Sequence, residues 1–197
     1  MIEELRIVPA NGASADDVDA VFASGDPARC RCQWFKVRYA DWGGLPVPER
    51  AARLRAQTRC GEPEADTTTG LVAYLAGQPV GWCAVEPRTA YPRLLTAKVP
   101  WAGRNEDRND ETVWAVTCFV IRSDYRRRGV SRALTRAAVR YAQDRGARAL
   151  EAYPVVDGAS NNAERFVGIE GVFADAGFLP VSRPTHHRVV MRHDLRR

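Results

Sequence analysis

The chain has 197 residues and a formal net charge of +5, and its hydrophobic content of 45% is ordinary for a globular protein with a sizeable core. This length suits a single domain over residues 1–197. No apolar run approaches the roughly 20 residues of a membrane helix, and the acidic start lacks the apolar segment of a signal peptide, so we expect a cytoplasmic protein without a membrane partner.

The first 60 residues predict one strand and two helices. Loose alternation of apolar residues over 2–8 favours a strand. Ser14 suits the N-cap of a helix that ends near residue 24, where Gly-Asp-Pro follows. A second helix is expected over about 48–60, because it begins at a proline and Gly61 can stop it.

A hairpin and a long loop come next. The apolar runs 71–75 and 80–85 flank the turn residues Ala-Gly-Gln-Pro, which is a hairpin signal. The stretch 88–110 contains two prolines, a glycine and a polar run over 104–110. A loop of about 20 residues in a compact domain is usually functional or mobile. We therefore expect a surface loop over 88–110, and we leave open whether it covers a binding site.

The most informative stretch is 113–146, which predicts a strand, a tight basic loop and a helix. Its first nine residues, 113–121, are rich in β-branched and aromatic side chains, which indicates a strand buried on both faces. After the polar turn 122–125, the sequence Arg-Arg-Arg-Gly-Val-Ser leads into a helix whose apolar residues recur every three or four positions. Gly146 can adopt the left-handed conformation that closes this helix.

The C-terminal third predicts three more strands and a short helix. The run 148–153 reads as a strand stopped by a proline, and the Gly/Ser/Asn-rich segment 155–165 reads as a loop. A short helix is expected over 168–176. The remaining strands are expected over 179–182 and 188–192.

The basic loop has the chemistry of an anion-binding site. The first N–H groups of a helix have no partner within the helix, and the helix dipole is positive there. Gly129 lets the backbone approach a ligand, Ser131 is small, and the arginines 126–128 favour a phosphate or pyrophosphate. The loop is neither a P-loop nor a dinucleotide fingerprint, because Gly-Lys-Ser/Thr and G-x-G-x-x-G are both absent.

The pattern Arg126-x-x-Gly129-x-Ser131, between a strand and a helix, resembles the acyl-CoA pyrophosphate loop of the GNAT superfamily of N-acetyltransferases, usually Gln/Arg-x-x-Gly-x-Gly/Ala. Ser131 is a mild departure. A second likeness is 172–178, which resembles the helix-to-Gly-Phe ending that follows the fifth strand in many members. The resemblance covers 71–191 and implies an α/β fold, with a mixed central sheet of about six to seven strands flanked by helices.

The same resemblance implies acetyl-CoA as cosubstrate and no metal. Main-chain groups of Phe119 and Ile121 would contact the pantetheine arm, and Arg126 to Ser131 would hold the pyrophosphate. The implied coenzyme-binding residues are Phe119, Val120, Ile121, Arg126, Arg127, Arg128, Gly129, Val130, Ser131 and Arg132.

The chain departs from the family where a proton is exchanged. The tyrosine that can protonate the leaving thiolate is replaced by Phe173, and the family's asparagine in the same helix corresponds to Phe166. Some members carry a glutamate on the buried strand where this chain has Ala115. No base is therefore obvious, and the candidate catalytic residues are Tyr153, Glu170 and His186, with His187 beside the last of these. Residues of these types are more often ordinary ones: a tyrosine that makes a hydrogen bond at a strand end, a solvated glutamate and a histidine pair in an exposed loop.

The implied activity is direct transfer of an acetyl group from acetyl-CoA to a primary amine of a small molecule or a lysine. The long loop and the aromatic residues Trp34, Phe35, Trp101 and Trp114 slightly favour an enclosed small-molecule site. A lysine or polyamine would need acidic lining, which residues 106–111 could supply. The run 30–36 is either part of the acceptor site or an ordinary core segment.

We also considered other classes of protein. The missing tyrosine allows a regulatory module that binds acyl-CoA without turnover. A nucleic-acid binder is disfavoured because no recognition motif accompanies the arginines. The five cysteines contain only one close pair, Cys30 and Cys32, far from the histidines, so a metal site is not expected, and Cys118 is a weak candidate nucleophile. The oligomeric state is left open, with a homodimer as one option.

Overall fold

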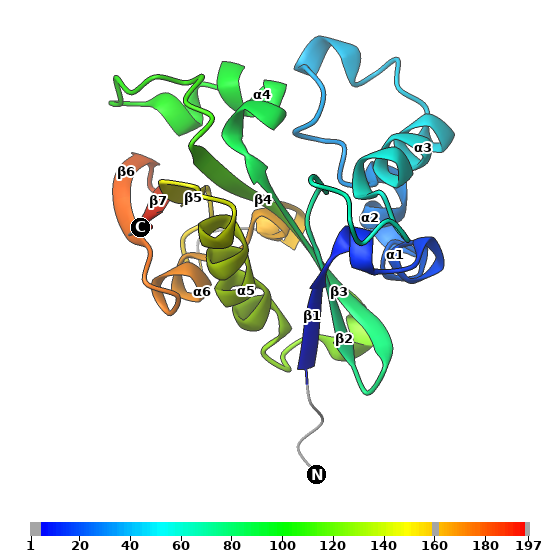
Figure 1. The fold of residues 1–197 in the computed structure, drawn as a ribbon. Helices are drawn as coiled ribbons and strands as arrows, with labels where there is room; N and C mark the ends of the chain where they lie inside the picture. Colours follow the sequence, from blue (N-terminus) through cyan, green and yellow to red (C-terminus); the bar gives the residue numbers. More distant parts are fainter. Residues whose placement is uncertain (1–4, 159–161, 196–197) are drawn as a thin grey trace.

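The computed structural model describes residues 5–158 and 162–195, which form one seven-stranded sheet with helices on both faces (Figure 1). The strand order is β1-β2-β3-β4-β5-β7-β6, and every neighbouring pair is antiparallel except β4 and β5, which are parallel. The strands are β1 Leu5–Pro9, β2 Leu71–Leu75, β3 Gln78–Pro87, β4 Val113–Ile121, β5 Ala149–Ala152, β6 Leu179–Thr185 and β7 Arg188–Asp194. The mixed sheet of six to seven strands that the family resemblance implied is confirmed.

The α-helices divide between the two faces of the sheet. α5 packs on one face through an apolar stripe that repeats at helical spacing, and α1 and α3 contribute to the core on the other face. The helices are α1 Ala15–Val21, α2 Gly25–Cys30, α3 Val47–Thr58, α4 Pro92–Thr96, α5 Val130–Asp144 and α6 Glu170–Ala174. In the described ranges, no helix combines the length and the apolar character needed to cross a bilayer.

The N-terminal helices begin and end for local reasons. The Ser14 side chain accepts a hydrogen bond from the Asp17 N–H at 3.0 Å, which is the predicted cap of α1. α1 ends at Val21, however, and α2, which was not predicted, begins at Gly25. A proline in a first turn has its φ already set for a helix, so Pro27 helps to start α2 instead of only ending α1.

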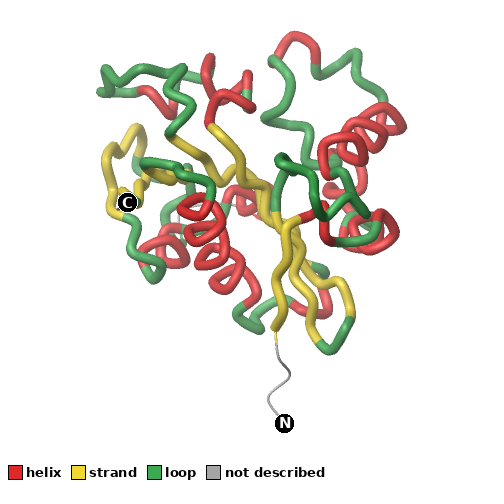
Figure 2. Tube along the Cα trace, in the orientation of Figure 1, coloured by secondary structure: helices red, strands yellow, loops and turns green. Residues whose placement is uncertain are grey.

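The segment 88–110, expected to be a surface loop, is only partly exposed. It contains α4 and two short 3₁₀ turns, η3 Arg88–Ala90 and η4 Val99–Trp101, which break the loop path in Figure 2. Tyr91, Leu94 and Trp101 are buried, and so is Arg88. The physical reason is that Arg88 forms a buried ion pair with a β5 side chain, which draws the segment onto the sheet.

The two parallel strands β4 and β5 pair only over a short distance. Their register joins 113–116 to 149–152, after which β5 ends, whereas β4 continues to Ile121. β4 also carries a bulge, because Ala84 faces Cys118 and Val85 faces Val116, so that Thr117 has no partner on β3. The second half of β4 is therefore free of β5 on one side, at the carboxyl end of a parallel pair, where α/β proteins commonly bind ligands.

Candidate active site

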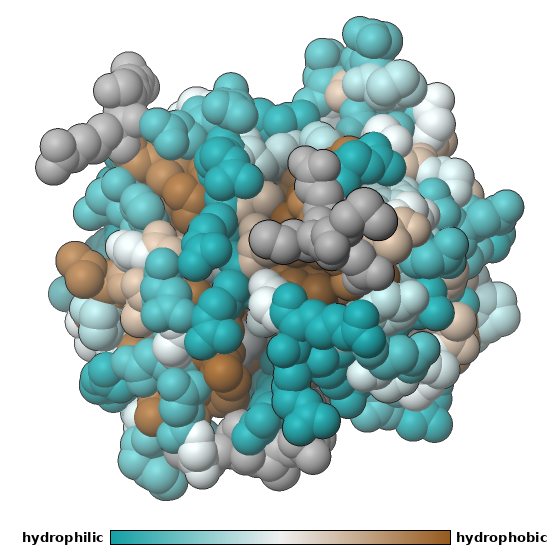
Figure 3. Space-filling view, turned by 90° about the horizontal axis from the view of Figure 1, so that it is seen from below, coloured by the Kyte–Doolittle hydropathy of each residue, from teal (hydrophilic) through white to brown (hydrophobic). Residues whose placement is uncertain are grey.

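A cleft of about 1310 Å³ runs along the second half of β4. Its walls come from five parts of the chain: the segment 20–34 around α2, residues 42 and 50 before and on α3, the end of β4 over 118–121, the loop and helix start over 122–132, and the segment 165–172. In Figure 3, which shows the molecule from below, apolar surface is visible in recesses between hydrophilic side chains. The cleft thus combines an apolar strand wall with a charged loop.

The loop after β4 presents free backbone donors at one end of this cleft. Gly129 is the N-cap of the 15-residue helix α5, has a φ of 78°, and provides no side-chain cap. Arg127 also lies in the left-handed region, with a φ of 61°. Alternation of such residues with extended or right-handed ones turns successive N–H groups toward one point and makes an anion-binding nest. Together with the helix dipole, this geometry can hold a phosphate.

The arginines of this loop differ in how they face the cleft. Arg126 and Arg127 are exposed and line it. Arg132 also lines it, but its Nε donates to Asp175 Oδ2 at 2.6 Å in a half-exposed ion pair. Arg128 does not line the cleft, and its guanidinium lies 5.3 Å from the centre of the Tyr125 ring. Arg122 also lines the cleft and has Asp124 4.0 Å away, so within the described residues Arg126 and Arg127 are the cleft arginines of this loop without an acidic partner.

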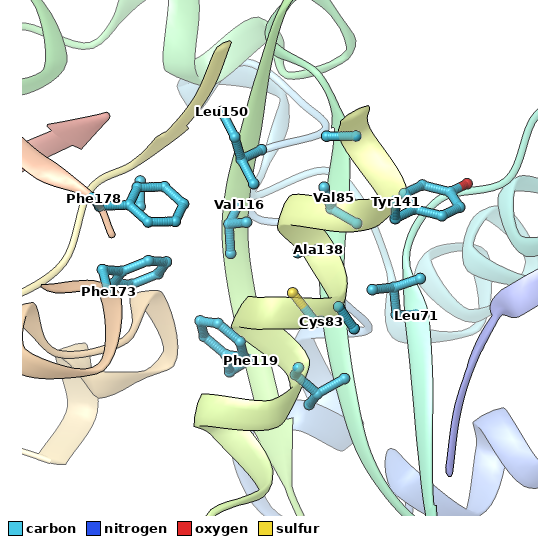
Figure 4. Close-up of a cluster of buried hydrophobic side chains, with 14 of the residues drawn as sticks. Leu71, Cys83, Val85, Val116, Phe119, Ala138, Tyr141, Leu150, Phe173 and Phe178 are labelled. Carbon is cyan, nitrogen blue, oxygen red and sulfur yellow. The ribbon is translucent and has the colours of Figure 1, made fainter. Parts of the chain in front are cut away.

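The β4 wall includes Phe119, Val120 and Ile121, the strand residues that the family resemblance implied for coenzyme binding. Behind this wall, the Phe119 ring packs 5.8 Å from that of Phe173, which in turn packs 5.2 Å from Phe178 (Figure 4). Phe173 is fully buried and does not line the cleft. The phenylalanine that replaces the family's tyrosine is thus a core residue without a proton to donate.

The three predicted catalytic side chains do not meet in this cleft. Tyr153 is buried, and its hydroxyl donates to Glu151 at 2.7 Å, an environment in which burial and that carboxylate raise the pKa of the phenol. Glu170 accepts from Arg183 at 2.6 Å. His186 is exposed beside His187 in the turn between β6 and β7. None of the three lines the cleft.

The acidic residues of 106–111 are also placed elsewhere. Glu106 pairs with Arg104 and Arg192. Hydrogen bonds from Thr112 and Arg148 lower the pKa of Asp110 to about 2. No residue of 106–111 lines the cleft, so the acidic lining that a lysine or polyamine would need is not supplied by this segment.

Cysteine side chains also line the cleft. Cys32 and Cys118 lie on its wall, and the Trp82 Nε1–H donates to Cys32 Sγ at 3.3 Å. Hydrogen bonding from Cys118 and then from Trp82 lowers the pKa of Cys32. In the described part of the chain, no three His, Cys, Asp or Glu side chains gather closely enough to hold a metal ion.

Trp34, Trp42 and Arg50 complete the wall on the α2–α3 side. The run 30–36 had been singled out in the sequence, with an acceptor site as one of two interpretations, and both Cys32 and Trp34 line the cleft. Trp42 and Arg50 carried no sequence signal, because they reach the cleft only through the packing of the 38–50 segment.

The family model and the similar solved structures both indicate acetyltransferases. A family model described as the acetyltransferase (GNAT) family matches residues 33–167. A search of curated proteins finds no match. Among solved structures, an N-acetyltransferase from Staphylococcus aureus Mu50 has 16% identity and a TM-score of 0.55, covering 98% of this chain and 99% of that chain.

Two further structures share the fold at similar levels. A GCN5-related N-acetyltransferase from Kribbella flavida has 18% identity and a TM-score of 0.55, covering 97% of this chain and 98% of the other. The structure of yncA, a putative acetyltransferase from Salmonella typhimurium with its cofactor acetyl-CoA, has 14% identity and a TM-score of 0.55. The match covers 98% of this chain and 94% of the yncA chain.

Proposed function

The chain belongs to the acetyltransferase (GNAT) family, and we propose that it moves the acetyl group of acetyl-CoA to a primary amine by direct attack. The observation that carries this proposal is the left-handed Gly129 at the start of α5, which opens unpaired helix N–H groups into a cleft along the free edge of β4. A Cβ at Gly129 would have nothing within 4 Å, so the space in front of these donors is open to a pyrophosphate.

Successive parts of the cleft wall can be assigned to successive parts of the coenzyme. The loop 126–131 would hold the pyrophosphate through backbone N–H groups, with charge from Arg126 and Arg127. Backbone groups of 119–121 would hold the pantetheine arm along the strand edge that β5 leaves free. Acetyl-CoA supplies the thioester, and a β4 N–H near the bulge can polarise its carbonyl as a modest oxyanion hole.

The chain's own contribution to the chemistry is positioning. The amine must be neutral to attack, and its proton has to leave through water or a side chain at the cleft. Because Tyr153, Glu170 and His186 all lie off the cleft wall, we assign the proton to solvent-mediated loss. Phe173 cannot protonate the leaving thiolate, so this step also falls to water.

The test is calorimetric titration with acetyl-CoA, followed by a thiol-release assay with a panel of amines. Saturable micromolar binding, absent with adenosine, and release of CoA only when an amine is present would support the proposal. The lack of a tyrosine at position 173 favours one alternative, a regulatory module that binds acyl-CoA without turnover. Binding without thiol release for any amine would support that alternative, and no binding would contradict both.

Replacing Arg126 with alanine is expected to weaken acetyl-CoA binding by about 10- to 100-fold, because a charge-assisted hydrogen bond to phosphate is lost. The same calorimetric titration measures the change. Arg140→Ala on the exposed face of α5 is the matched control, since Arg140 is a helix arginine that does not line the cleft. Equal affinities for both variants would mean that the Arg126 side chain stays in solvent when the coenzyme binds.

A further inference from the structure

The positive charge of the cleft is not confined to the proposed coenzyme loop. The charged side chains on its wall are seven arginines and two aspartates, with no lysine or glutamate among the described residues. Four of the arginines, at 122, 126, 127 and 132, belong to the loop after β4 and its helix. The other three arginines are Arg29, Arg50 and Arg165, which come from other segments of the chain.

Arg50, on α3, is held in a fixed position without a carboxylate partner. Its guanidinium stacks 3.8 Å from the centre of the Trp42 ring. Its Nη1 donates to the Arg29 carbonyl at 3.0 Å, and its Nη2 donates to the Trp42 carbonyl at 3.4 Å. A guanidinium has five N–H donors, so one N–H on each Nη has no partner in the described structure, and neither does the buried Nε–H.

Neighbouring arginines, unlike Arg50, have carboxylate partners. Arg29 pairs with Asp26 at 2.6 Å and Arg31 pairs with Asp19 at 2.6 Å. On α3 itself, other arginines also have acidic partners: Arg53 pairs with Glu49, and Arg55 pairs with Asp19. Against this background, Arg50 is a preorganised cation at the cleft whose charge the described part of the protein does not neutralise. A ligand is the remaining source of a negative group.

The surroundings of Arg50 place it on the acceptor side of the cleft. Trp34 and Trp42 form an edge-to-face pair with ring centres 5.0 Å apart and line the same wall. This wall continues through Cys32 to Cys118 on β4, next to the strand positions proposed for the pantetheine arm. A molecule that binds to the tryptophans and Arg50 would therefore share the cleft with the strand positions proposed for the pantetheine arm.

We propose that the acceptor amine also carries an anionic group, a carboxylate or a phosphate, and that Arg50 is the residue that selects it. This inference rests on the proposed acetyl transfer and names its substrate class. A guanidinium binds either anion through paired N–H donors, and it repels a second cationic group. Polyamines and lysine side chains in basic surroundings are accordingly disfavoured as acceptors.

The first experiment compares matched amines on the wild-type protein. L-Amino acids are assayed against their carboxamides, and O-phosphoethanolamine against ethanolamine, by thiol release at saturating acetyl-CoA. We expect kcat/KM to be at least about 10-fold higher for the anionic member of a pair, and the pair that responds identifies carboxylate or phosphate. The amide lowers the pKa of its neighbouring amine, so the larger neutral fraction alone would favour the carboxamide. Equal or reversed rates, or a panel in which no anionic amine is acetylated, would overturn the inference.

The second experiment assigns the preference to Arg50. Arg50→Gln is expected to raise KM for the anionic acceptor by about 10- to 100-fold, to leave the neutral member of the pair unchanged, and to leave KM for acetyl-CoA within about twofold. Arg53→Gln is the matched control, because Arg53 lies on the same helix, pairs with Glu49 and does not line the cleft. A rise in KM for acetyl-CoA alone would place Arg50 on a coenzyme phosphate and overturn its role in acceptor choice.

The two proposals fail in distinguishable ways. If acetyl-CoA does not bind the wild-type protein, the acetyl transfer itself is contradicted. If acetyl-CoA binds and neutral or polycationic amines are acetylated as fast as anionic ones, only the substrate class is contradicted.

Discussion

Replacing Glu151 with glutamine is expected to lower the free energy of unfolding by about 3–5 kcal/mol, because it leaves a buried cation without its partner. The Glu151 and Arg88 side chains are both fully buried and lie 3.1 Å apart, from Oε2 to Nη1. Glu151 also accepts from Arg104, and the Tyr153 hydroxyl donates to it at 2.7 Å. Urea unfolding followed by circular dichroism would measure the loss.

Glu106→Gln is the matched control for this prediction. Glu106 pairs with the same Arg104 at 2.9 Å, but its side chain is 39% exposed. Exposed ion pairs contribute about 0–1 kcal/mol, so this variant should unfold close to the wild-type midpoint. Similar small losses in both variants would mean that water reaches the Glu151 carboxylate and screens the cluster.

The same cluster explains why the segment 88–110 was difficult to predict. Arg88 and Arg104 lie in that segment, and their guanidinium carbons lie 4.7 and 5.2 Å from the centre of the Trp101 ring. The polar run 104–110 reads as solvated in the sequence, because no local pattern shows which partner neutralises each charge. Here the partner is Glu151, 47 residues beyond Arg104, and only the tertiary fold brings the two together.

The stretch 113–146 was predicted accurately because its signals are local. The apolar run of β4, the repeat of apolar residues in α5 and the glycine before the helix each act within a few residues. On the α2–α3 side of the cleft only the run 30–36 carried a sequence signal, whereas Trp42 and Arg50 line the same cleft through tertiary packing alone. The three residues predicted as catalytic bases lie away from the cleft for a related reason. The residue type indicates which chemistry a side chain can perform, but tertiary packing decides whether that side chain lines the cleft.

Replacing Gly129 with tryptophan is expected to weaken acetyl-CoA binding by at least about 100-fold, since two or more hydrogen bonds to a charged group would be lost. Gly129 has a φ of 78°, which disfavours any residue with a Cβ. The space around a Cβ there is open to beyond 4 Å, so the protein can still fold, but an indole would occupy the room in front of the α5 N–H groups. Calorimetric titration with acetyl-CoA measures the effect on binding.

Gly146→Trp separates this effect from backbone strain. Gly146 follows the other end of α5 and has a φ of 76°, and a Cβ at this position would also meet nothing within 4 Å, so both variants should lose a similar free energy of unfolding. Gly146 does not line the cleft, and acetyl-CoA affinity should therefore stay at the wild-type value. An affinity that falls equally in both variants would trace the loss to a weakened helix, whereas a selective loss at Gly129 would identify the start of α5 as the phosphate site.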